Sequence, residues 1–287
     1  MRKNGMLVLW CVAVVWLVLF VPLSALSADI EEPTVMVLKY AEFNLFPNYA
    51  AYWMGEPVYS SQPPLHYFMY YWLIKTKGRN ILVDVGSGPD FSKRYLKYQP
   101  PDVMLSKIGL KPSDIDTIII SHPHFDHIDG MDFFKDAMVY IQRAAYRYAV
   151  EEAPEFKFFR GSMYPRKKDT LTLVNLMWDT RLKILDGDKE LFPGIKVIKV
   201  DGHYPGMQIV VVQTAGKPVV IASDAVHIYD NLEKDKPMGI YHGNLRDIVK
   251  GFEIIRELNG IVLPGHDKKV FERGFKVIDE SILQVYP

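Results

Sequence analysis

Short apolar runs rich in β-branched residues alternate along this chain with stretches in which apolar residues recur at helical spacing. We predict strands at residues 35–40, 68–75, 80–84, 117–121, 137–141, 195–200, 207–213 and 217–222, the last two as a hairpin-like pair that turns at Ala215 and Gly216. Helical spacing predicts helices at residues 102–108, 143–151 and 244–258. Mixed strands and helices indicate a layered α/β domain.

The chain begins with a stretch that has the pattern of a secretory leader. Arg2 and Lys3 precede an uncharged segment, residues 6–21, which is followed by Pro22 and small residues up to Ala28. We predict that residues 1–28 are a signal peptide and that the protein is exported to the periplasm or secreted. An uncleaved membrane anchor is the alternative, because about 20 apolar residues can span a bilayer.

Residues 29–287 are expected to form one domain. The chain has 287 residues, of which 49% are hydrophobic and 24% charged, enough for a full core. Its 19 prolines and 19 glycines are spread out, without a low-complexity linker or a repeat that would divide it.

Cysteine content and charge narrow the chemistry. The single cysteine, Cys11, lies in the leader, so the mature chain has neither a disulfide nor a thiolate ligand or nucleophile. Without Arg2 and Lys3 the chain carries 32 basic and 34 acidic residues, which gives no nucleic-acid footprint. The short basic run at residues 166–168 is interpreted as a solvated loop.

The strongest chemical signal is the segment His122-Pro-His124-Phe-Asp126-His127, directly after the predicted strand at residues 117–121. In an extended segment, His122 and His124 lie on the same side and can bind one metal ion. If a helix begins near Asp126, then Asp126 and His127 diverge from this pair and face a second ion. The spacing therefore predicts two neighbouring metals, with an ordinary solvated loop as the alternative.

Further candidate ligands follow other predicted strands. His203, Asp224 and His266 each lie in a loop beside a strand-like run. Five of the eight histidines thus fall in the candidate site, leaving His66, His227 and His242 for other roles. Gly-His and Pro-Gly pairs are common in turns, so only the ordered set is specific.

This ordered set resembles the metallo-β-lactamase superfamily, whose His-x-His-x-Asp-His, Gly-His-x-Pro-Gly, Ser-Asp-Ala and Pro-Gly-His motifs appear here in order. The resemblance implies a four-layer αββα sandwich with its metals at one edge. It also implies that Asp84 orients a ligand from behind, although an Asp before Gly is by itself more often a turn former. The ligand sets that it implies are His122, His124 and His203 for one zinc, Asp126, His127 and His266 for the other, and Asp224 as the bridge.

The chemistry of such a site is hydrolysis. His and carboxylate ligands suit two Zn²⁺ ions, although iron, manganese or cobalt would also fit. Zinc lowers the pKa of bound water from about 15.7 towards 7, so a hydroxide held between two ions is a nucleophile at neutral pH. Asp126 and Asp224 are candidates for moving the proton to the leaving group. Lactones, esters, thioesters, β-lactams and phosphodiesters all fit this scheme.

Two segments, residues 223–233 and 142–146, resemble the N-acyl homoserine lactone lactonase branch of the superfamily. Lactonases of this branch commonly place a Tyr three residues after the bridging Asp, where it donates to the substrate carbonyl. Here the position is occupied by His227, which can donate the same kind of hydrogen bond; the alternative is a loop residue with a structural partner. Homodimers occur in this branch, and the resemblance allows one here.

The rest of the chain offers candidates for substrate contacts. Aromatic residues within 43–59, with Phe156, Phe158 and Phe159, are predicted to line an apolar pocket for an acyl chain, with core packing as the alternative. Residues 156–178 follow neither strand nor helix period and are predicted to form a lid or substrate loop. We therefore expect an exported dizinc hydrolase of hydrophobic lactones. Another hydrolase of the same fold, or a non-catalytic metal-binding member, remains the alternative.

Overall fold

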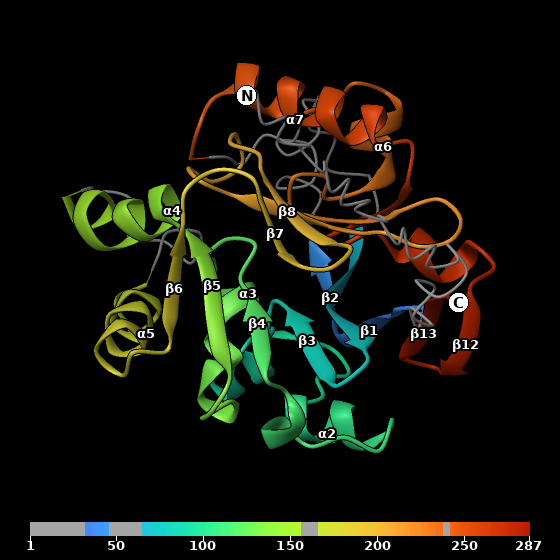
Figure 1. Cartoon of the computed structure of the whole chain (residues 1–287), viewed down its shortest axis with the longest axis horizontal. Helices are drawn as coiled ribbons and strands as arrows, with labels where there is room; N and C mark the ends of the chain where they lie inside the picture. Colours follow the sequence, from blue (N-terminus) through green and yellow to red (C-terminus); the bar gives the residue numbers. More distant parts are fainter. Residues whose placement is uncertain (1–31, 46–64, 156–165, 238–241) are drawn as a thin grey trace, which may run out of the picture. The chain divides into compact units, whose positions relative to one another are not determined.

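Two β-sheets form the centre of the part of the chain that the computed structural model describes, residues 32–45, 65–155, 166–237 and 242–287 (Figure 1). The larger sheet has eight strands in the order β12-β13-β1-β2-β3-β4-β5-β6, and the smaller has five in the order β11-β10-β9-β8-β7. In the larger sheet, β3 to β6 are parallel to one another, whereas β12, β13, β1, β2 and β3 pair antiparallel. In the smaller sheet only β10 and β11 are parallel.

The strands of the larger sheet are β1 (Thr34–Leu45), β2 (Leu65–Thr76), β3 (Arg79–Val83), β4 (Thr117–Ile119), β5 (Met138–Gln142), β6 (Leu182–Leu185), β12 (Lys276–Asp279) and β13 (Ile282–Tyr286). Those of the smaller sheet are β7 (Lys189–Phe192), β8 (Ile195–Lys199), β9 (Gln208–Val212), β10 (Val219–Ser223) and β11 (Ile261–Pro264). The helices are α2 (Pro101–Ser106), α3 (Phe125–Ile128), α4 (Arg143–Arg147), α5 (Lys167–Trp178), α6 (Tyr229–Glu233) and α7 (Leu245–Glu257). Short turns of 3₁₀ or π helix are Pro89–Arg94, Pro112–Asp114, Asp129–Phe133, Tyr148–Glu152, Ala153–Glu155 and Lys268–Glu272.

Alternating side chains of the strands build two apolar layers. On β2, Trp72 and Ile74 are buried in a cluster with Val210 and Ile221 of the smaller sheet, so this layer lies between the sheets. The intervening Leu73 faces the other way. It belongs to a second cluster with residues of α2. Because strand side chains alternate, one strand serves both layers.

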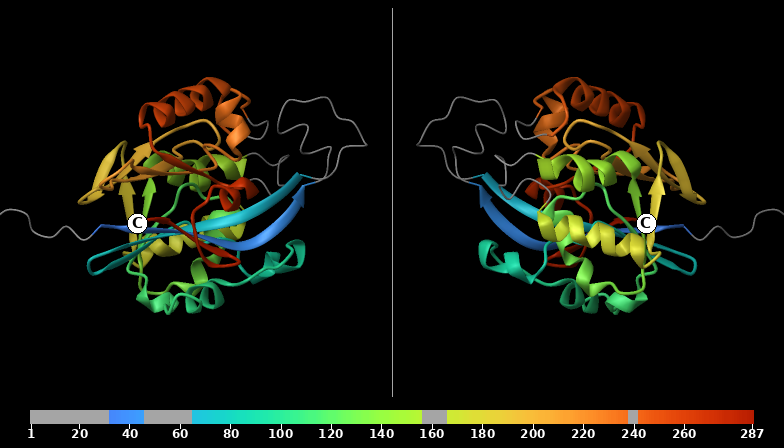
Figure 2. Two further views of the ribbon diagram at one scale, coloured as in Figure 1. Left: turned by 90° about the vertical axis from the view of Figure 1, so that its right-hand side faces the viewer. Right: turned by 90° about the vertical axis from the view of Figure 1, so that its left-hand side faces the viewer.

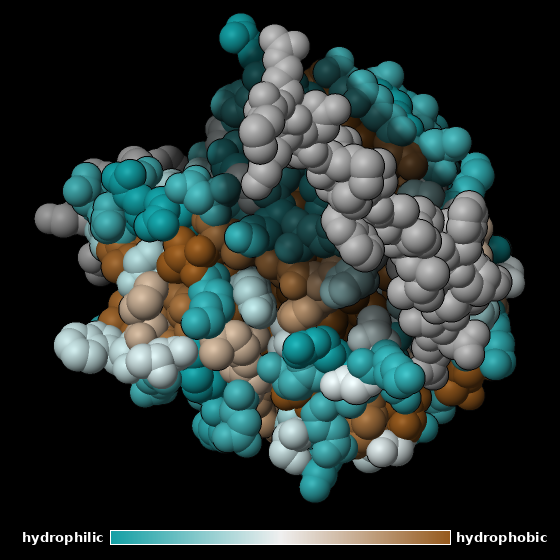
Figure 3. Space-filling model, in the orientation of Figure 1, coloured by the Kyte–Doolittle hydropathy of each residue, from teal (hydrophilic) through white to brown (hydrophobic). Residues whose placement is uncertain are grey.

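Helix α7 covers the outer face of the smaller sheet (Figures 1 and 2). Its N-cap, Asn244, accepts a hydrogen bond from the backbone N–H of Asp247 at 3.0 Å. Ile248, Phe252 and Ile255 form its buried stripe. The surface over α6 and α7 is mainly hydrophilic (Figure 3). With α2 on the opposite side of the larger sheet, the layers follow the predicted αββα sandwich.

The predicted strands are present, and the structure contains four further short strands that the sequence did not indicate. The eight predicted strands correspond to β1 to β5 and β8 to β10, and β9 pairs antiparallel with β10 as expected. The sequence did not indicate β6, β7, β12 and β13, which are only four or five residues long and partly exposed. Such short, partly exposed strands carry little periodic signal.

The prediction of a loop at residues 156–178 was wrong for its second half, which is helix α5 (Lys167–Trp178). Leu173 and Leu176 are buried, but Leu171 and Trp178 are 47% and 83% exposed, so apolar residues on two faces blur the helical period. Residues 156–165, the leader and residues 46–64 lie outside the described part of the chain. No helix in the described part is long and apolar enough to cross a membrane.

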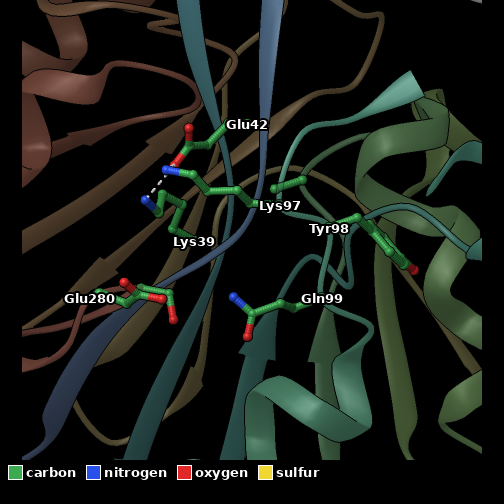
Figure 4. Close-up of a pocket in the computed structure, with 8 residues that line it drawn as sticks. Lys39, Glu42, Lys97, Tyr98, Gln99 and Glu280 are labelled. Carbon is green, nitrogen blue, oxygen red and sulfur yellow. Dashed lines mark hydrogen bonds and ion pairs between the residues drawn. The ribbon is translucent and has the colours of Figure 1, made fainter. Parts of the chain in front are cut away.

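A buried carboxylate stabilises the edge where β1 meets the loop at residues 95–99. Glu42 is only 3% exposed, and its Oε1 accepts hydrogen bonds from Lys39 at 2.7 Å and Lys97 at 3.1 Å. His66 Nε2 lies 3.1 Å from its other oxygen. The cluster borders a pocket of about 200 Å³ (Figure 4). Because the buried carboxylate is paired within the chain, this pocket needs no ligand to neutralise it.

Helix α7 should depend on Phe252 for its attachment to the smaller sheet. Phe252→Ala is expected to lower the free energy of unfolding by about 3–5 kcal/mol, because it opens a cavity in the buried cluster. Val249, on the same helix, is 42% exposed, and Val249→Ala should change that free energy by less than about 0.5 kcal/mol. Urea unfolding measures both. Equal losses in the two variants would contradict this packing.

The Glu42 cluster makes a pH-dependent contribution to stability. Burial alone would raise the pKa of Glu42, but hydrogen bonds and charge from Lys39 and Lys97 lower that pKa below its ordinary value of 4.5. The stabilisation is therefore present above pH 4.5 and is lost as the pH falls through the lower pKa of the folded state.

Glu42→Gln is expected to lower the free energy of unfolding by about 1–2 kcal/mol at pH 7, and the difference from the parent should shrink below about pH 4. Glu280→Gln, at the exposed rim of the same pocket, serves as the control with no comparable loss. Urea unfolding across this pH range measures the effect. A difference that grows towards low pH would contradict the account.

Candidate functional site

The candidate metal ligands meet because four strand-end loops converge. The segment after β4 carries His122 and His124 and leads into α3, which carries Asp126 and His127. The loops after β8, β10 and β11 supply His203, Asp224 and His266, respectively. The structure brings together all seven residues proposed from the sequence, in two groups that could each hold a metal ion.

The first group consists of His122, His124, His203 and Asp224, all buried, with their ligand atoms within 4.8 Å of one another. Nδ1 of His124 lies 2.9 Å from Nε2 of His122 and 3.0 Å from Nε2 of His203. Asp224 Oδ2 lies 3.6 Å from Nε2 of His203. Three imidazole nitrogens and a carboxylate therefore face one point.

The second group consists of Asp126, His127, Asp224 and His266, which are also buried. Nε2 of His127 lies 3.5 Å from carboxylate oxygens of both Asp126 and Asp224. Nε2 of His266 lies 3.1 Å from Asp224 Oδ1 and 3.6 Å from Asp126 Oδ2. Asp224 belongs to both groups, which is the geometry expected of a carboxylate that bridges two ions.

Unpaired atoms in the site fit a bound cation. His127 Nε2 and Asp224 Oδ1 are buried without a hydrogen-bond partner among the described residues. Such atoms are costly unless an ion, a proton or water satisfies them. In a tetrahedral zinc site with Zn–N distances of 2.0–2.1 Å, neighbouring nitrogens are about 3.3 Å apart, close to the 2.9–3.0 Å observed in the first group. The donor set therefore fits two zinc ions.

Asp84 contacts the segments that carry three of the candidate ligands, on the side away from the two groups. The residue has a left-handed backbone with φ of 61°, and its Oδ1 accepts the backbone N–H of Ser121 at 2.7 Å. Its Oδ2 accepts the hydroxyls of Ser121 at 2.8 Å and Ser223 at 3.2 Å, and it lies 2.8 Å from Nδ1 of His127. With the proton on Nδ1, the lone pair of His127 Nε2 faces the site. This geometry agrees with the orienting role expected for Asp84.

Strand β2 orients His266 in a similar way, although the sequence did not indicate it. Nδ1 of His266 lies 3.2 Å from the carbonyl oxygen of Phe68, to which it can donate. The backbone N–H of Phe68 donates in return to the carbonyl of His266 at 3.1 Å. Tyr67 stacks on the imidazole, with ring centres 5.4 Å apart and planes 7° apart. The aromatic content of β2 was the only sequence signal for this contact.

Burial and the neighbouring charges shift the pKa values of the candidate ligands in both directions. Burial, together with the neighbouring imidazoles, lowers the pKa of His122 and His124 well below 6.5, which keeps their lone pairs available. Burial alone would raise the pKa of Asp224, but His227, His266 and His127 hold that pKa well below its ordinary value. Burial acts to lower the pKa of His127, yet the surrounding carboxylates raise it well above 6.5. The pKa values of the carboxylates and of the histidines in the site therefore depend on one another.

His227, the candidate for the lactonase Tyr position, is buried at the centre of this arrangement. Its Nε2 lies 3.0 Å from Oδ2 of Asp224, and its Nδ1 lies 3.1 Å from the backbone carbonyl of the same residue. Its ring is 4.8 Å from that of His203 and 5.3 Å from that of His266. The structure therefore places His227 beside the candidate bridging carboxylate.

The basic run at residues 166–168 is not the solvated loop that we predicted. Arg166 pairs with buried Asp129 at 2.8 Å, and Lys168 pairs with the same carboxylate at 2.9 Å. Asp129 follows α3 directly, so the pairs attach the start of α5 to the motif segment. The Arg166 guanidinium also lies 4.5 Å above the Phe91 ring, which stacks on Phe125 at 4.5 Å. The prediction was wrong because the sequence pattern does not show that Asp129 is buried and pairs with Arg166 and Lys168.

Part of the predicted substrate wall can be placed. Phe43 lies on β1 and packs edge-on against Tyr95, with ring centres 6.1 Å apart, so it contributes to the apolar core. Phe156, Phe158 and Phe159 lie outside the described residues. A residue that the sequence left without a role, His242, lies next to the first group, with its ring 4.9 Å from that of His124.

The chain is similar in sequence and in fold to known lactonases. An N-acyl homoserine lactonase from Bacillus sp. is 32% identical over 182 residues, which span 62% of this chain and 66% of the relative. The chain thus covers slightly less than two thirds of that relative. Among solved structures, a quorum-quenching N-acyl homoserine lactone lactonase superimposes with a TM-score of 0.67 at 22% identity, covering 86% of this chain and 96% of that one.

AidC, a dizinc quorum-quenching lactonase solved with a product, gives a TM-score of 0.67 at 17% identity over 90% of this chain and 96% of its own. These structural likenesses establish the sandwich fold. The sequence itself matches the family described as the metallo-beta-lactamase superfamily over residues 68–266, a span that contains all seven candidate ligands. With its motifs in order and its loops converging at one edge of the sandwich, the chain belongs to the metallo-β-lactamase superfamily.

Proposed function

We propose that this protein hydrolyses N-acyl homoserine lactones or related hydrophobic lactones, with two divalent metal ions, zinc first among them. The observation that carries the proposal is Asp224, whose two oxygens face both groups of candidate ligands. Support for the substrate comes from the relatives, several of which are named N-acyl homoserine lactonases. The residues proposed as ligands are His122, His124 and His203 at one ion, Asp126, His127 and His266 at the other, and Asp224 at both.

Metal ions at these positions would activate water and polarise the lactone carbonyl. The chain's own groups would direct the reaction. His122 and His124 offer neutral imidazoles, whose pKa values burial lowers. As water adds to the carbonyl carbon, Asp126 or Asp224 takes the proton released and returns it to the ring oxygen as the acyl C–O bond breaks. The product is the open-chain hydroxy acid.

His227 is proposed to bind the lactone carbonyl oxygen through an imidazole N–H. Two acceptors near its ring are Oδ2 of Asp224, 3.0 Å from Nε2, and the backbone carbonyl of Asp224, 3.1 Å from Nδ1. Since a neutral imidazole donates through only one nitrogen, the proposal requires the N–H on Nε2 to turn from Asp224 to the lactone carbonyl when the substrate binds. Burial lowers the pKa of His227, which favours the neutral form. A donor held in a buried site contributes more to transition-state stabilisation than the same donor in water.

Export is also proposed, on the sequence of residues 1–28 alone. A lactone signal that diffuses between cells would then be met outside the cytoplasm. Amino-terminal sequencing of protein recovered from the cell envelope tests this directly: a mature chain starting at Ala28 or Asp29 supports cleavage, whereas an intact Met1 in the membrane fraction supports an anchor.

The central test is proton release by zinc-loaded protein on a long-chain N-acyl homoserine lactone. We expect turnover, and Asp224→Asn should reduce kcat/KM by at least about 100-fold, since even residues that only support a ligand typically contribute 10–100-fold. Glu280→Gln, outside both ligand groups, should behave like the parent. Hydrolysis of nitrocefin without lactone opening would instead identify a β-lactamase. Zinc binding without turnover on lactones, esters or phosphodiesters would identify a non-catalytic member.

The role of His227 is tested by a pair of substitutions. His227→Phe removes the donor and is expected to lower kcat/KM for the lactone by about 10–100-fold, while two zinc ions per chain are retained. His227→Tyr restores a donor and should stay within about fivefold of the parent. Unchanged kinetics in the Phe variant, or equal losses in both variants, would show that His227 does not bind the carbonyl.

A further inference from the structure

Each candidate histidine ligand has one ring nitrogen that faces the other ligands and one, the outward nitrogen, that faces away. For His124 the outward nitrogen lacks a hydrogen-bond partner among the described residues. A histidine that binds a metal through one nitrogen usually donates its other N–H to a fixed acceptor. His127 has Asp84 at 2.8 Å, His266 has the carbonyl of Phe68 at 3.2 Å, and His122 has the hydroxyl of Ser121 at 3.0 Å. His124 differs from these three.

His124 faces the other ligands through Nδ1, at 2.9 Å from His122 Nε2 and 3.0 Å from His203 Nε2. Its outward nitrogen is therefore Nε2. This atom is buried and has no hydrogen-bond partner among the described residues. Because a ligand with its lone pair on Nδ1 carries the proton on Nε2, the structure leaves a buried N–H donor without an acceptor. Such a donor destabilises the folded chain if it stays unpaired.

His242 is the imidazole next to His124 that is not in either ligand group. The two rings have centres 4.9 Å apart and planes 66° apart. The backbone N–H of His242 donates to the carbonyl of His203 at 2.7 Å, and that of Gly243 donates to Gly202 at 3.0 Å. A Cβ at Gly243 would lie 2.5 Å from the carbonyl oxygen of Gly202. The close pairing fixes His242 beside the first group.

The second nitrogen of His242 has a defined neighbour. Its Nδ1 lies 3.4 Å from the hydroxyl of Tyr148. If Nδ1–H donates to this oxygen, Nε2 carries the lone pair and is an acceptor. Tyr204, whose ring lies 5.1 Å from that of His124 and 5.6 Å from that of His242, has a buried hydroxyl without a partner. His124 Nε2 and the Tyr204 hydroxyl, two buried polar atoms without a partner among the described residues, thus belong to rings that pack against each other.

We propose that His242 is a positioning residue for the first metal: it accepts the Nε2–H of His124 through one bound water, and so fixes the tautomer in which Nδ1 faces the ion. The inference rests on the metal-binding part of the proposed function and is independent of the substrate. A water held between these groups would have enough polar partners to be retained. His242 acts through His124 and does not bind the ion itself.

The test is zinc affinity, measured by competition with a chromophoric chelator at fixed pH. His242→Phe keeps an aromatic ring and removes the acceptor, so one of the two zinc equivalents should bind about 10–100-fold more weakly, and the other should stay within about threefold. His242→Gln places a carbonyl oxygen near the position of Nε2 and is expected to restore both equivalents to within about threefold of the parent. Tyr148→Phe, which keeps the His242 ring, is the matched neighbour and should have a smaller effect than His242→Phe.

Parental zinc affinity in His242→Phe, or a Gln variant as weak as the Phe variant, would overturn the proposal. Loss of one zinc equivalent altogether in both variants would instead make His242 a ligand. Should His242→Phe not fold, the histidine N–H spectrum of the ¹⁵N-labelled, zinc-loaded parent decides: a hydrogen-bonded Nε2–H assigned to His124 supports the proposal, and its absence contradicts it. Because no lactone is used, failure of the proposed substrate leaves this result unaffected.

Discussion

The structure at this edge of the sandwich depends on one buried carboxylate, Asp224, which is only 3% exposed and is shared by two groups of imidazoles and carboxylates. Burying an ionised carboxylate without compensation would cost far more than the stability of a domain allows. Within the described chain, the compensation comes from His227 on the same loop and from His266 and His127 on two other loops. The groups that meet at this carboxylate come from the loops after β4, β8 and β11.

The sandwich makes such convergence possible because both sheets end at the same edge. Asp84, at the end of β3, joins the two sheets through Ser121 after β4 and Ser223 at the end of β10. The same carboxylate orients His127. A single polar network therefore connects the two sheets at this edge and orients a candidate ligand. A change at Asp84 would affect both the packing of the sheets and the position of His127.

The sequence revealed the seven candidate ligands because their chemistry is local: each is a His or Asp at the end of an apolar strand, and the spacing in the motif separates two pairs. The contacts that orient them are not local. Tyr67 reaches His266 from 199 positions away in the chain, and His242 reaches His124 through pairing of its backbone with residues 202–203. Neither contact leaves a periodic or motif signal. Asp129 likewise pairs with Arg166 and Lys168 only in the folded chain, which is why that basic run was misinterpreted.

Asp224 is proposed to lie between two metal ions, and anomalous diffraction from crystals of the zinc-loaded protein would locate these ions. We expect two zinc peaks per chain, one coordinated by His122, His124 and His203, the other by Asp126, His127 and His266, with Asp224 bound to both. A single zinc peak, or two peaks with Asp224 bound to neither ion, would contradict it.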